Sequence, residues 1–205
     1  SYHLPVVNLC DNPGVLAGTS WEELVQTRIF DPLGMTSSGF SVTHAQQMPD
    51  YARPYRGDED GVKEIPFLNI DAIGPAGSIT STITDMSRWL LLNLNRGELD
   101  GKRIISEAQM AELHTPRMVM PSTWNKYPES ALPAYAHGWG VDTYRGHTKL
   151  AHGGNIDGFS SLVSFLPDDG IGVVVLTNKN SSLLPRNITF TVIDRLLDLP
   201  EVSWN

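Results

Sequence analysis

One glycine-rich stretch combines the residue types that hydrolytic chemistry needs. It runs from Leu150 to Ser161 and contains His152, Gly153 and Gly154 in succession. An apolar entry followed by two glycines predicts a strand whose outer end lacks side chains, so that another backbone can approach closely. A substrate carbonyl lying there could accept a hydrogen bond from a main-chain N–H, as an oxyanion hole requires, with His152 as donor or proton carrier. The alternative is a glycine-rich turn beside a surface histidine.

Composition limits what kind of protein can carry this stretch. The chain has 205 residues, 40% of them hydrophobic, which is enough for one sizeable core and fits a single domain. Fifteen basic against 23 acidic residues, with no basic cluster, argue against nucleic acid as a partner. No apolar run approaches about 18 residues, so no membrane span is predicted. Cys10 is the only cysteine and excludes an intramolecular disulfide.

The first 134 residues are rich in helices and loops. Ser20-Trp21-Glu22-Glu23 is a capping box that opens a helix, and we expect Asp31-Pro32 to end that helix. A hairpin with a charged tip at Gly57–Gly61 is predicted between Tyr51–Tyr55 and Val62–Phe67. Two helices are predicted after it, from about Ile83 to Asn95 and from Ser106 to Pro116, followed by a loop from Pro121 to Pro133.

From residue 135 the hydrophobic period becomes strand-like. Four strands joined by short turns are predicted at Tyr135–Tyr144, Thr148–Gly153, Phe159–Leu166 and Ile171–Thr177. Short connections predict an antiparallel meander, and a last helix, about Leu183–Leu197, packs on it with Pro185 in its first turn. The predicted fold class is therefore α+β, an antiparallel sheet with helices packed on it. We expect 1–205 to be a single domain or a fragment, divided into 1–134 and the strands and helix of 135–205.

Five ordered motifs resemble those of the serine β-lactamase-like hydrolases. They are Arg28–Met35, Pro75–Thr82 running into Asp85–Trp89, His137–Gly140, His152–Gly154 with Gly158–Ser161, and Gly172–Asn178. That family includes class C β-lactamases, penicillin-binding D-Ala-D-Ala carboxypeptidases, D-amino-acid peptidases and esterases. The resemblance covers roughly residues 20–200 and implies a β-lactamase/transpeptidase-like fold, here incomplete, in a parent protein outside the cytoplasm. It implies no cofactor.

The resemblance also implies roles for single residues. In such enzymes the serine of Ser-x-x-Lys attacks a carbonyl, the tyrosine of Tyr-x-Asn relays protons, and Lys-Thr-Gly or His-x-Gly lies on the strand edging the site. His152 and Gly154 match the third motif, and Asn155 matches the residue whose N–H contributes to the oxyanion hole. Tyr2 lies at about the distance expected for the tyrosine, yet Tyr2-His3-Leu4 lacks the asparagine.

The sequence departs from the family at its nucleophile. No Ser-x-x-Lys occurs in the chain; the nearest spelling, Thr123-Trp124-Asn125-Lys126, lies in a predicted loop. In the resembling family the serine lies much further upstream than the 27 residues before Arg28 allow. We therefore expect part of a serine hydrolase that acts on a β-lactam, D-amino-acid peptide or acyl ester through an acyl-enzyme, with its nucleophile outside this chain. The isolated chain is expected to be inactive.

Two alternatives come from other functional classes. One is a non-catalytic descendant that binds a peptide or acyl ligand, or serves as a scaffold. The other is a metal hydrolase that uses His137, His147, His152 and Asp157, because imidazole and carboxylate suit zinc.

Three structural expectations follow. Trp124, Tyr127, Tyr135 and Trp139 either line the site or are core and rim aromatics. The Asn155 N–H should point outward at a sheet edge, because a donor paired within a ladder cannot stabilise an oxyanion. An open apolar edge of the sheet should promote self-association.

Overall fold

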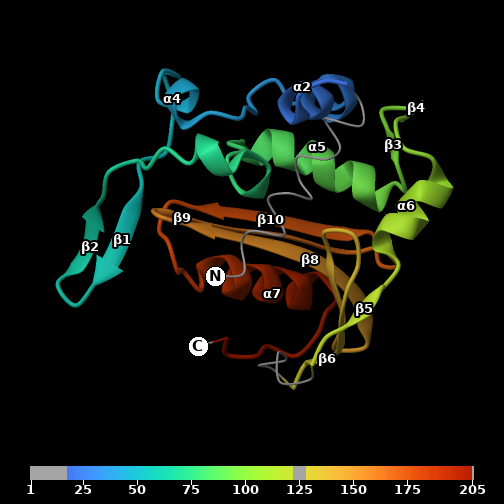
Figure 1. The fold of residues 1–205 in the computed structure, drawn as a ribbon. Coiled ribbons are helices and arrows are strands. Elements are labelled where there is room, and N and C mark those ends of the chain that lie inside the picture. Colours follow the sequence, from blue (N-terminus) through green and yellow to red (C-terminus); the bar gives the residue numbers. More distant parts are fainter. Residues whose placement is uncertain (1–17, 122–127, 205) are drawn as a thin grey trace. The chain divides into compact units, whose positions relative to one another are not determined.

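The computed structural model describes residues 18–121 and 128–204, which form two compact units. Unit 1 comprises residues up to 88 together with 155–159 and 178–181. Unit 2 comprises 89–154, 160–177 and the residues from 182 on. Figure 1 shows the elements of both units, and each unit is described separately below.

Unit 1 begins with the predicted capping box. Ser20 Oγ accepts the Glu23 N–H at 3.1 Å, which confirms Ser20 as the N-cap of α2 (Trp21–Val25), while the Glu23 carboxylate accepts from the Thr19 hydroxyl. The prediction that Asp31-Pro32 ends the helix is wrong. The chain continues through a π-helical turn, η1 (Gln26–Phe30), into α3 (Asp31–Leu33), where Pro32 lies in the first turn and its missing N–H is not needed. Gly34, with φ 64°, ends the helix in a left-handed conformation.

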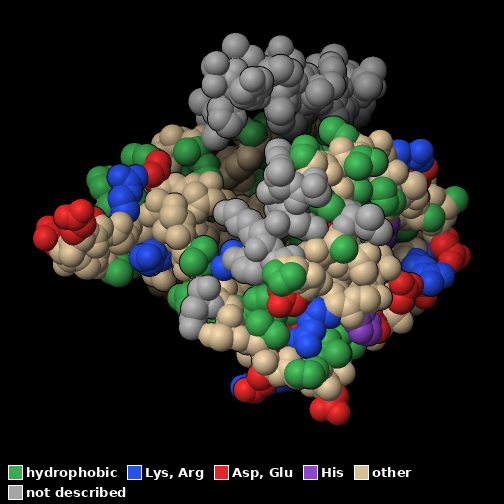
Figure 2. Space-filling view, turned by 90° about the horizontal axis from the view of Figure 1, so that it is seen from below, with side chains coloured by type: hydrophobic (Ala, Val, Ile, Leu, Met, Phe, Trp, Pro, Cys, Tyr) green, Lys and Arg blue, Asp and Glu red, His purple; other side chains and the backbone are tan. Residues whose placement is uncertain are grey.

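The remaining elements of unit 1 include the predicted hairpin. They are α4 (Val42–Ala45), β1 (Tyr55–Asp58), β2 (Gly61–Glu64), η2 (Asp71–Ala76) and the first part of α5 (Ile83–Leu94). Strands β1 and β2 pair antiparallel with Asp58 opposite Gly61, so the turn is shorter than predicted. The tip is exposed as expected, and Figure 2 shows acidic side chains gathered on it, at the left of the view.

The core of unit 1 forms around aromatic side chains and one buried carboxylate. The Phe40 ring stacks on Phe30 at 5.1 Å and meets the Trp21 ring edge-on at 4.9 Å. Asp85, 3% exposed, accepts the Ser37 N–H and the Ser38 hydroxyl, both at 2.8 Å. These bonds fix the loop after α3 to the start of α5 and satisfy the buried charge.

A six-stranded sheet is the centre of unit 2, in the order β10-β9-β8-β7-β6-β5. Its strands are β5 (Met118–Val119), β6 (Ser130–Tyr135), β7 (Gly140–Tyr144), β8 (His147–Ile156), β9 (Phe159–Leu166) and β10 (Ile171–Thr177). The last residues of β8 and the first of β9 form a hairpin tip, 155–159, that belongs to unit 1. Strands β9 and β10 have the predicted bounds, and β8 runs past both glycines as a strand.

Two sequence predictions about this sheet are wrong. The strand predicted from Tyr135 to Tyr144 is two strands, because residues 136–139 form a loop in which Gly138 has φ 83°. The loop predicted from Pro121 to Pro133 already contains most of β6, and β5, which lies before that loop, was not predicted. Pro133 argued against a strand here, because proline has no N–H to donate to a neighbouring strand. The structure accommodates it at an irregularity, since the β6–β7 register shifts between Ala131 and Ala134.

Helices cover both faces of the sheet within unit 2. Helix α7 (Leu184–Leu196) packs on one face through a buried cluster of Tyr144, Leu166, Val173, Phe190, Ile193 and Trp204. Successive strand residues face opposite sides, and a Cβ at Gly172, next to Val173, would lie 2.6 Å from Leu90 of α5. The second part of α5 therefore covers the other face.

Shorter elements complete unit 2. They are α6 (Glu107–His114), capped by Ser106 as predicted, and a hairpin of β3 (Glu98–Leu99) and β4 (Lys102–Arg103). An antiparallel sheet with helices packed on it confirms the predicted α+β class. No helix in the described part of the chain is both long and apolar enough to cross a membrane.

Candidate active site

Strand β8 carries the predicted site residues near its end. His152, Gly153 and Gly154 are exposed. Strand β7 pairs with β8 from Tyr144↔His147 to Gly140↔Ala151, so His152 and the residues after it extend beyond the first residue of β7. The polar end of β8 is therefore placed where a second backbone could lie alongside it.

Of the predicted lining aromatics that the structure describes, Tyr135 lies beside His152. Its ring centroid lies 6.5 Å from that of His152, in an edge-on arrangement within unit 2. Trp139 is instead a core residue, 6% exposed, whose ring meets Phe165 edge-on at 5.0 Å. Trp124 and Tyr127 lie outside the described residues, as does the predicted proton relay Tyr2.

Gly154 leaves space for a neighbouring side chain of β9. A Cβ at this position would lie 2.6 Å from Ser161 Oγ, whereas at Gly153 the nearest atom, Ser161 O, would be an ordinary 3.5 Å away. A larger residue at 154 would therefore force Ser161 to move. The sequence predicted room for another backbone at these glycines, whereas at Gly154 the missing side chain allows close packing between β8 and β9.

Asn155 follows Gly154 directly and has a partner that the sequence did not indicate. In unit 1 its Oδ1 accepts the main-chain N–H of Ser181 at 2.6 Å. Ser181 has a left-handed backbone with φ 52° and lies just beyond the end of β10. A contact between residues 26 positions apart leaves no periodic signal from which it could have been predicted.

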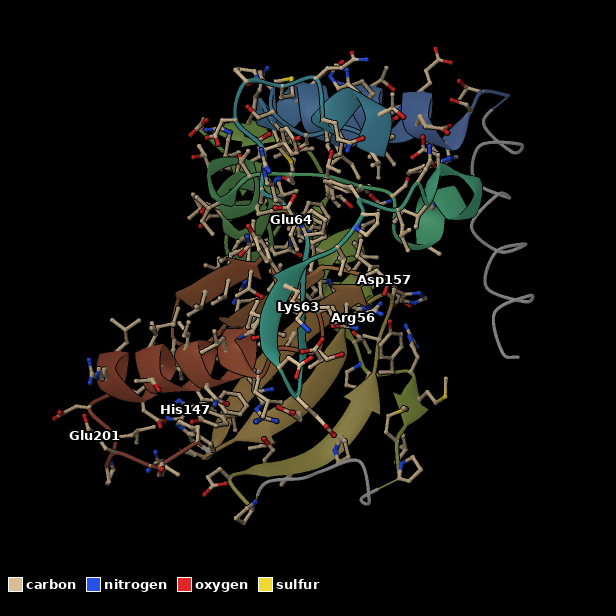
Figure 3. The ribbon with its side chains drawn as sticks, turned by 90° about the vertical axis from the view of Figure 1, so that its left-hand side faces the viewer. Arg56, Lys63, Glu64, His147, Asp157 and Glu201 are labelled. Atoms are coloured by element: carbon tan, nitrogen blue, oxygen red, sulfur yellow. The ribbon has the colours of Figure 1, made fainter. Side chains whose placement is uncertain are left out.

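The hairpin tip after Asn155 packs against the segment that enters β1. Gly158 has φ 89°, and a Cβ there would lie 2.1 Å from Pro54 Cβ, so only glycine fits. The Tyr55 N–H donates to Gly158 O at 3.4 Å. Arg56 forms an ion pair with Asp157, and Figure 3 shows the two side chains turned toward each other.

The same segment contacts the chain after β10. The Asn178 side-chain amide donates to Arg53 O, and the Asn180 N–H donates to Tyr55 O, both at 3.1 Å. Residues 53–56 thus bond to the hairpin tip and to residues 178–180 within unit 1. No sequence pattern indicated this role for residues 53–56.

Two titratable groups of unit 2 have shifted pKa values. Burial lowers the pKa of His114, whose Nε2 lies 3.0 Å from Asn93 Oδ1. Burial raises the pKa of Tyr144 far above its usual range, and its hydrogen bond to Asp194 raises it further. Both groups bond to buried polar side chains, which indicates structural roles.

Three of the four residues considered as metal ligands have separate partners. His147 Nδ1 lies 3.0 Å from the Asp169 carboxylate, His137 Nε2 lies 3.7 Å from Glu112, and Asp157 pairs with Arg56. Within residues 18–121 and 128–204, no group of three or more His, Cys, Asp or Glu residues is placed to hold a metal ion.

A family model described as Beta-lactamase matches residues 11–197, most of the chain. The chain belongs to the β-lactamase family. Curated members of similar sequence include the unguisins hydrolase ungD' of Aspergillus campestris, 27% identical over 198 residues, covering 93% of this chain and 36% of the relative. The β-lactamase of Escherichia coli K12 is 27% identical over 184 residues, covering 80% of this chain and 47% of the relative.

A similar solved structure confirms the fold. The octameric penicillin-binding protein homologue from Pyrococcus abyssi superimposes with a TM-score of 0.76 at 25% identity, over 89% of this chain and 39% of its own. The β-lactamase/transpeptidase-like fold predicted from the motifs is therefore confirmed. The chain spans less than half of the length of these curated relatives.

Proposed function

We propose that this chain forms one wall of the active site of a serine hydrolase that cleaves an amide or ester carbonyl through an acyl-enzyme. The observation that carries the proposal is the position of His152, Gly154 and Asn155 on the end of β8 that extends beyond β7. Membership of the β-lactamase family supports hydrolase chemistry. The substrate class is a β-lactam, a D-amino-acid peptide or an acyl ester.

The hairpin geometry supports a main-chain donor at Asn155. Strands β8 and β9 are joined by only Asp157 and Gly158, so Ile156 and Phe159 flank a two-residue turn. A pair next to such a turn exchanges both main-chain hydrogen bonds, and bonded and non-bonded pairs alternate along an antiparallel ladder. This alternation directs the Asn155 N–H away from β9, toward the side on which β7 has ended. A donor in that direction suits a developing oxyanion.

His152 is assigned the role of hydrogen-bond donor or proton carrier. It is exposed, three residues before Asn155, and its ring lies beside that of Tyr135. An imidazole at this position could donate to the substrate or pass a proton to the leaving group.

The nucleophile is assigned to a segment outside Ser1–Asn205. A serine needs a neighbouring base to be activated, and no Ser-x-x-Lys occurs in the sequence. Tyr2 stays a candidate for the proton relay. By resemblance to the family, the whole protein is assigned to a compartment outside the cytoplasm.

The proposal is tested with a longer chain that joins a Ser-x-x-Lys segment of its own reading frame to this sequence. Such a chain should hydrolyse an activated ester or a penicillin, and His152→Ala should lower kcat at least about ten-fold. His147→Ala, at the other end of the same strand, is the matched control and should keep the wild-type rate. Binding of the penicillin without turnover would instead support the non-catalytic alternative, and equal rates for both variants would remove His152 from the mechanism.

The sheet also supports a proposal about association. In the described part of the chain, β10 pairs with β9 alone, which leaves a seven-residue strand rich in valine at the edge of the sheet. An unpaired apolar edge of this length favours addition of a strand from a second copy. The octameric assembly named for the Pyrococcus abyssi homologue supports self-association.

A further inference from the structure

We propose that the Asn155 side chain is a positioning residue: by binding the Ser181 N–H it holds the end of β8 so that the main-chain N–H of Asn155 keeps one direction. The inference rests on the proposed function, because it concerns the residue assigned there as oxyanion donor. The resemblance to known hydrolases assigned only the main chain of this residue.

The end of β8 needs a restraint from outside the strand. Two consecutive glycines, Gly153 and Gly154, precede Asn155, and glycine loses more conformational freedom on ordering than any other residue. The pairing of β7 with β8 has already stopped at Ala151. Without further contacts, the residues after Ala151 would rely on one neighbouring strand for their order.

The contact of Asn155 with Ser181 supplies this restraint. A separation of 2.6 Å between Oδ1 and the Ser181 nitrogen makes the side-chain oxygen a close acceptor. Because the bond ends on a main-chain N–H, it fixes the Asn155 side chain relative to the backbone of another segment. Both residues belong to unit 1.

The segment that carries Ser181 is itself tied to the hairpin tip. The Asn180 N–H bonds to Tyr55 O, and the Tyr55 N–H bonds to Gly158 O. Pro54 packs against Gly158 so closely that no Cβ fits between them. Together with the bond between Asn155 and Ser181, these contacts link the hairpin tip both to residues 54–55 and to the segment after β10. The tip and that segment therefore restrain each other's position.

A fixed donor is what oxyanion stabilisation requires. Main-chain N–H groups lower the barrier when they are aimed in advance at the developing charge and need no reorganisation during the reaction. Loss of the Asn155 side-chain bond should therefore lower kcat and leave substrate binding nearly unchanged, because the donor becomes mobile and is still present.

The first test measures the contact in the 205-residue chain. Amide hydrogen exchange at Ser181, followed by NMR, should accelerate at least about ten-fold in Asn155→Leu, which keeps the size and removes the acceptor. Asn155→Asp retains an acceptor oxygen and should keep the wild-type rate within about three-fold. Asn69→Leu is the matched control, because the Asn69 side chain likewise accepts a main-chain N–H, that of Asp71, at 2.9 Å. Unchanged exchange at Ser181 in Asn155→Leu would overturn the inference.

The second test measures kinetics in the longer chain that carries the nucleophile. Asn155→Leu should lower kcat about ten-fold for hydrolysis of an activated ester and keep KM within about two-fold. Asn69→Leu should match the wild type in both constants. A normal kcat in Asn155→Leu, or a loss expressed only in KM, would overturn the positioning role.

The two tests separate this inference from the proposed function. If the wild-type longer chain does not hydrolyse any ester or penicillin, the proposed function fails, while the exchange rate of Ser181 still reports the contact. If hydrolysis occurs and both variants turn over normally, the proposed function stands and the positioning role fails.

Discussion

The Tyr144 hydroxyl donates a hydrogen bond to Asp194 Oδ1, 2.7 Å away, in the interior between β7 and α7. Tyr144 is 0% and Asp194 2% exposed, and Arg145 Nη1 lies 3.0 Å from the same oxygen. The buried carboxylate is thus held by a neutral donor and a cation. Asp194 of α7 therefore links the helix to Tyr144 of β7 and to Arg145 in the turn that follows β7.

Removing the hydroxyl should destabilise unit 2 without creating a cavity. Tyr144→Phe keeps the ring that stacks on Phe190 and leaves Asp194 with one partner fewer, which costs about 1–3 kcal/mol. Urea unfolding followed by circular dichroism measures the change. Tyr51→Phe, at a tyrosine that is 39% exposed, serves as the control and should stay within about 0.5 kcal/mol of the wild type. Equal stability of Tyr144→Phe and the wild type would show that the hydrogen bond from Tyr144 to Asp194 does not stabilise unit 2.

Local signals in the sequence were sufficient for much of the fold. The N-cap at Ser20 and the apolar strands β9 and β10 were predicted from near neighbours in the sequence, and the structure confirms them. Errors arose where one residue type has two meanings. Pro32 was predicted to end a helix, but it lies in the first turn of α3. Gly138 was predicted to lie within a strand, but it has a positive φ and belongs to a loop.

The candidate site was predictable only in part, for a related reason. His152, Gly154 and Asn155 are consecutive or nearly so, and an apolar run before them predicted the strand end on which they lie. The contacts of this end with Pro54, Tyr55 and Ser181 join positions far apart in the chain. Such contacts depend on tertiary packing, which no local pattern encodes.

Half-buried His114 should make stability depend on pH below neutrality. Its Nε2 donates to Asn93 Oδ1, since the Asn93 amide nitrogen already donates to Trp89 O. Burial lowers the pKa of His114 from 6.5, so the unfolded chain binds more protons as pH falls through 6.5, and stability is lost toward lower pH. This one group contributes at most about 1.4 kcal/mol per pH unit. In His114→Gln, the free energy of unfolding, measured with urea between pH 7.5 and 5.5, should change less with pH than in the wild type. The same pH dependence in both proteins would contradict this role of His114.

Alanine variants at Gly158 and Gly146 can distinguish the effect of backbone strain from that of steric overlap. Both have a positive φ, 89° and 95°, but a Cβ at Gly158 would meet Pro54 whereas at Gly146 no atom lies within 4 Å. Gly146→Ala should cost about 1–2 kcal/mol from strain alone, and Gly158→Ala should cost at least about 2 kcal/mol more. Thermal or urea unfolding of the two variants measures the difference. Losses of the same size would show that Pro54 does not confine the hairpin tip.

Self-association should depend on the edge strand β10. Light scattering is expected to show a dimer or larger assembly of the 205-residue chain, and Leu176→Lys, at a residue 40% exposed on β10, should shift it to monomers. Leu196→Lys, at a leucine 61% exposed on α7, is the matched control and should leave the assembly unchanged. A monomeric wild-type chain at high concentration would contradict the edge-pairing proposal.

The location of the nucleophile is tested most directly by covalent labelling with a fluorophosphonate, an activated ester and a penicillin, followed by peptide mapping. Without its nucleophile a hydrolase retains only the contribution of binding and the oxyanion hole. The isolated 205-residue chain should therefore give no burst and no adduct. The longer chain with a Ser-x-x-Lys segment should carry the label on a serine outside Ser1–Asn205. An adduct on any serine within these 205 residues would contradict the account and identify a nucleophile inside the chain.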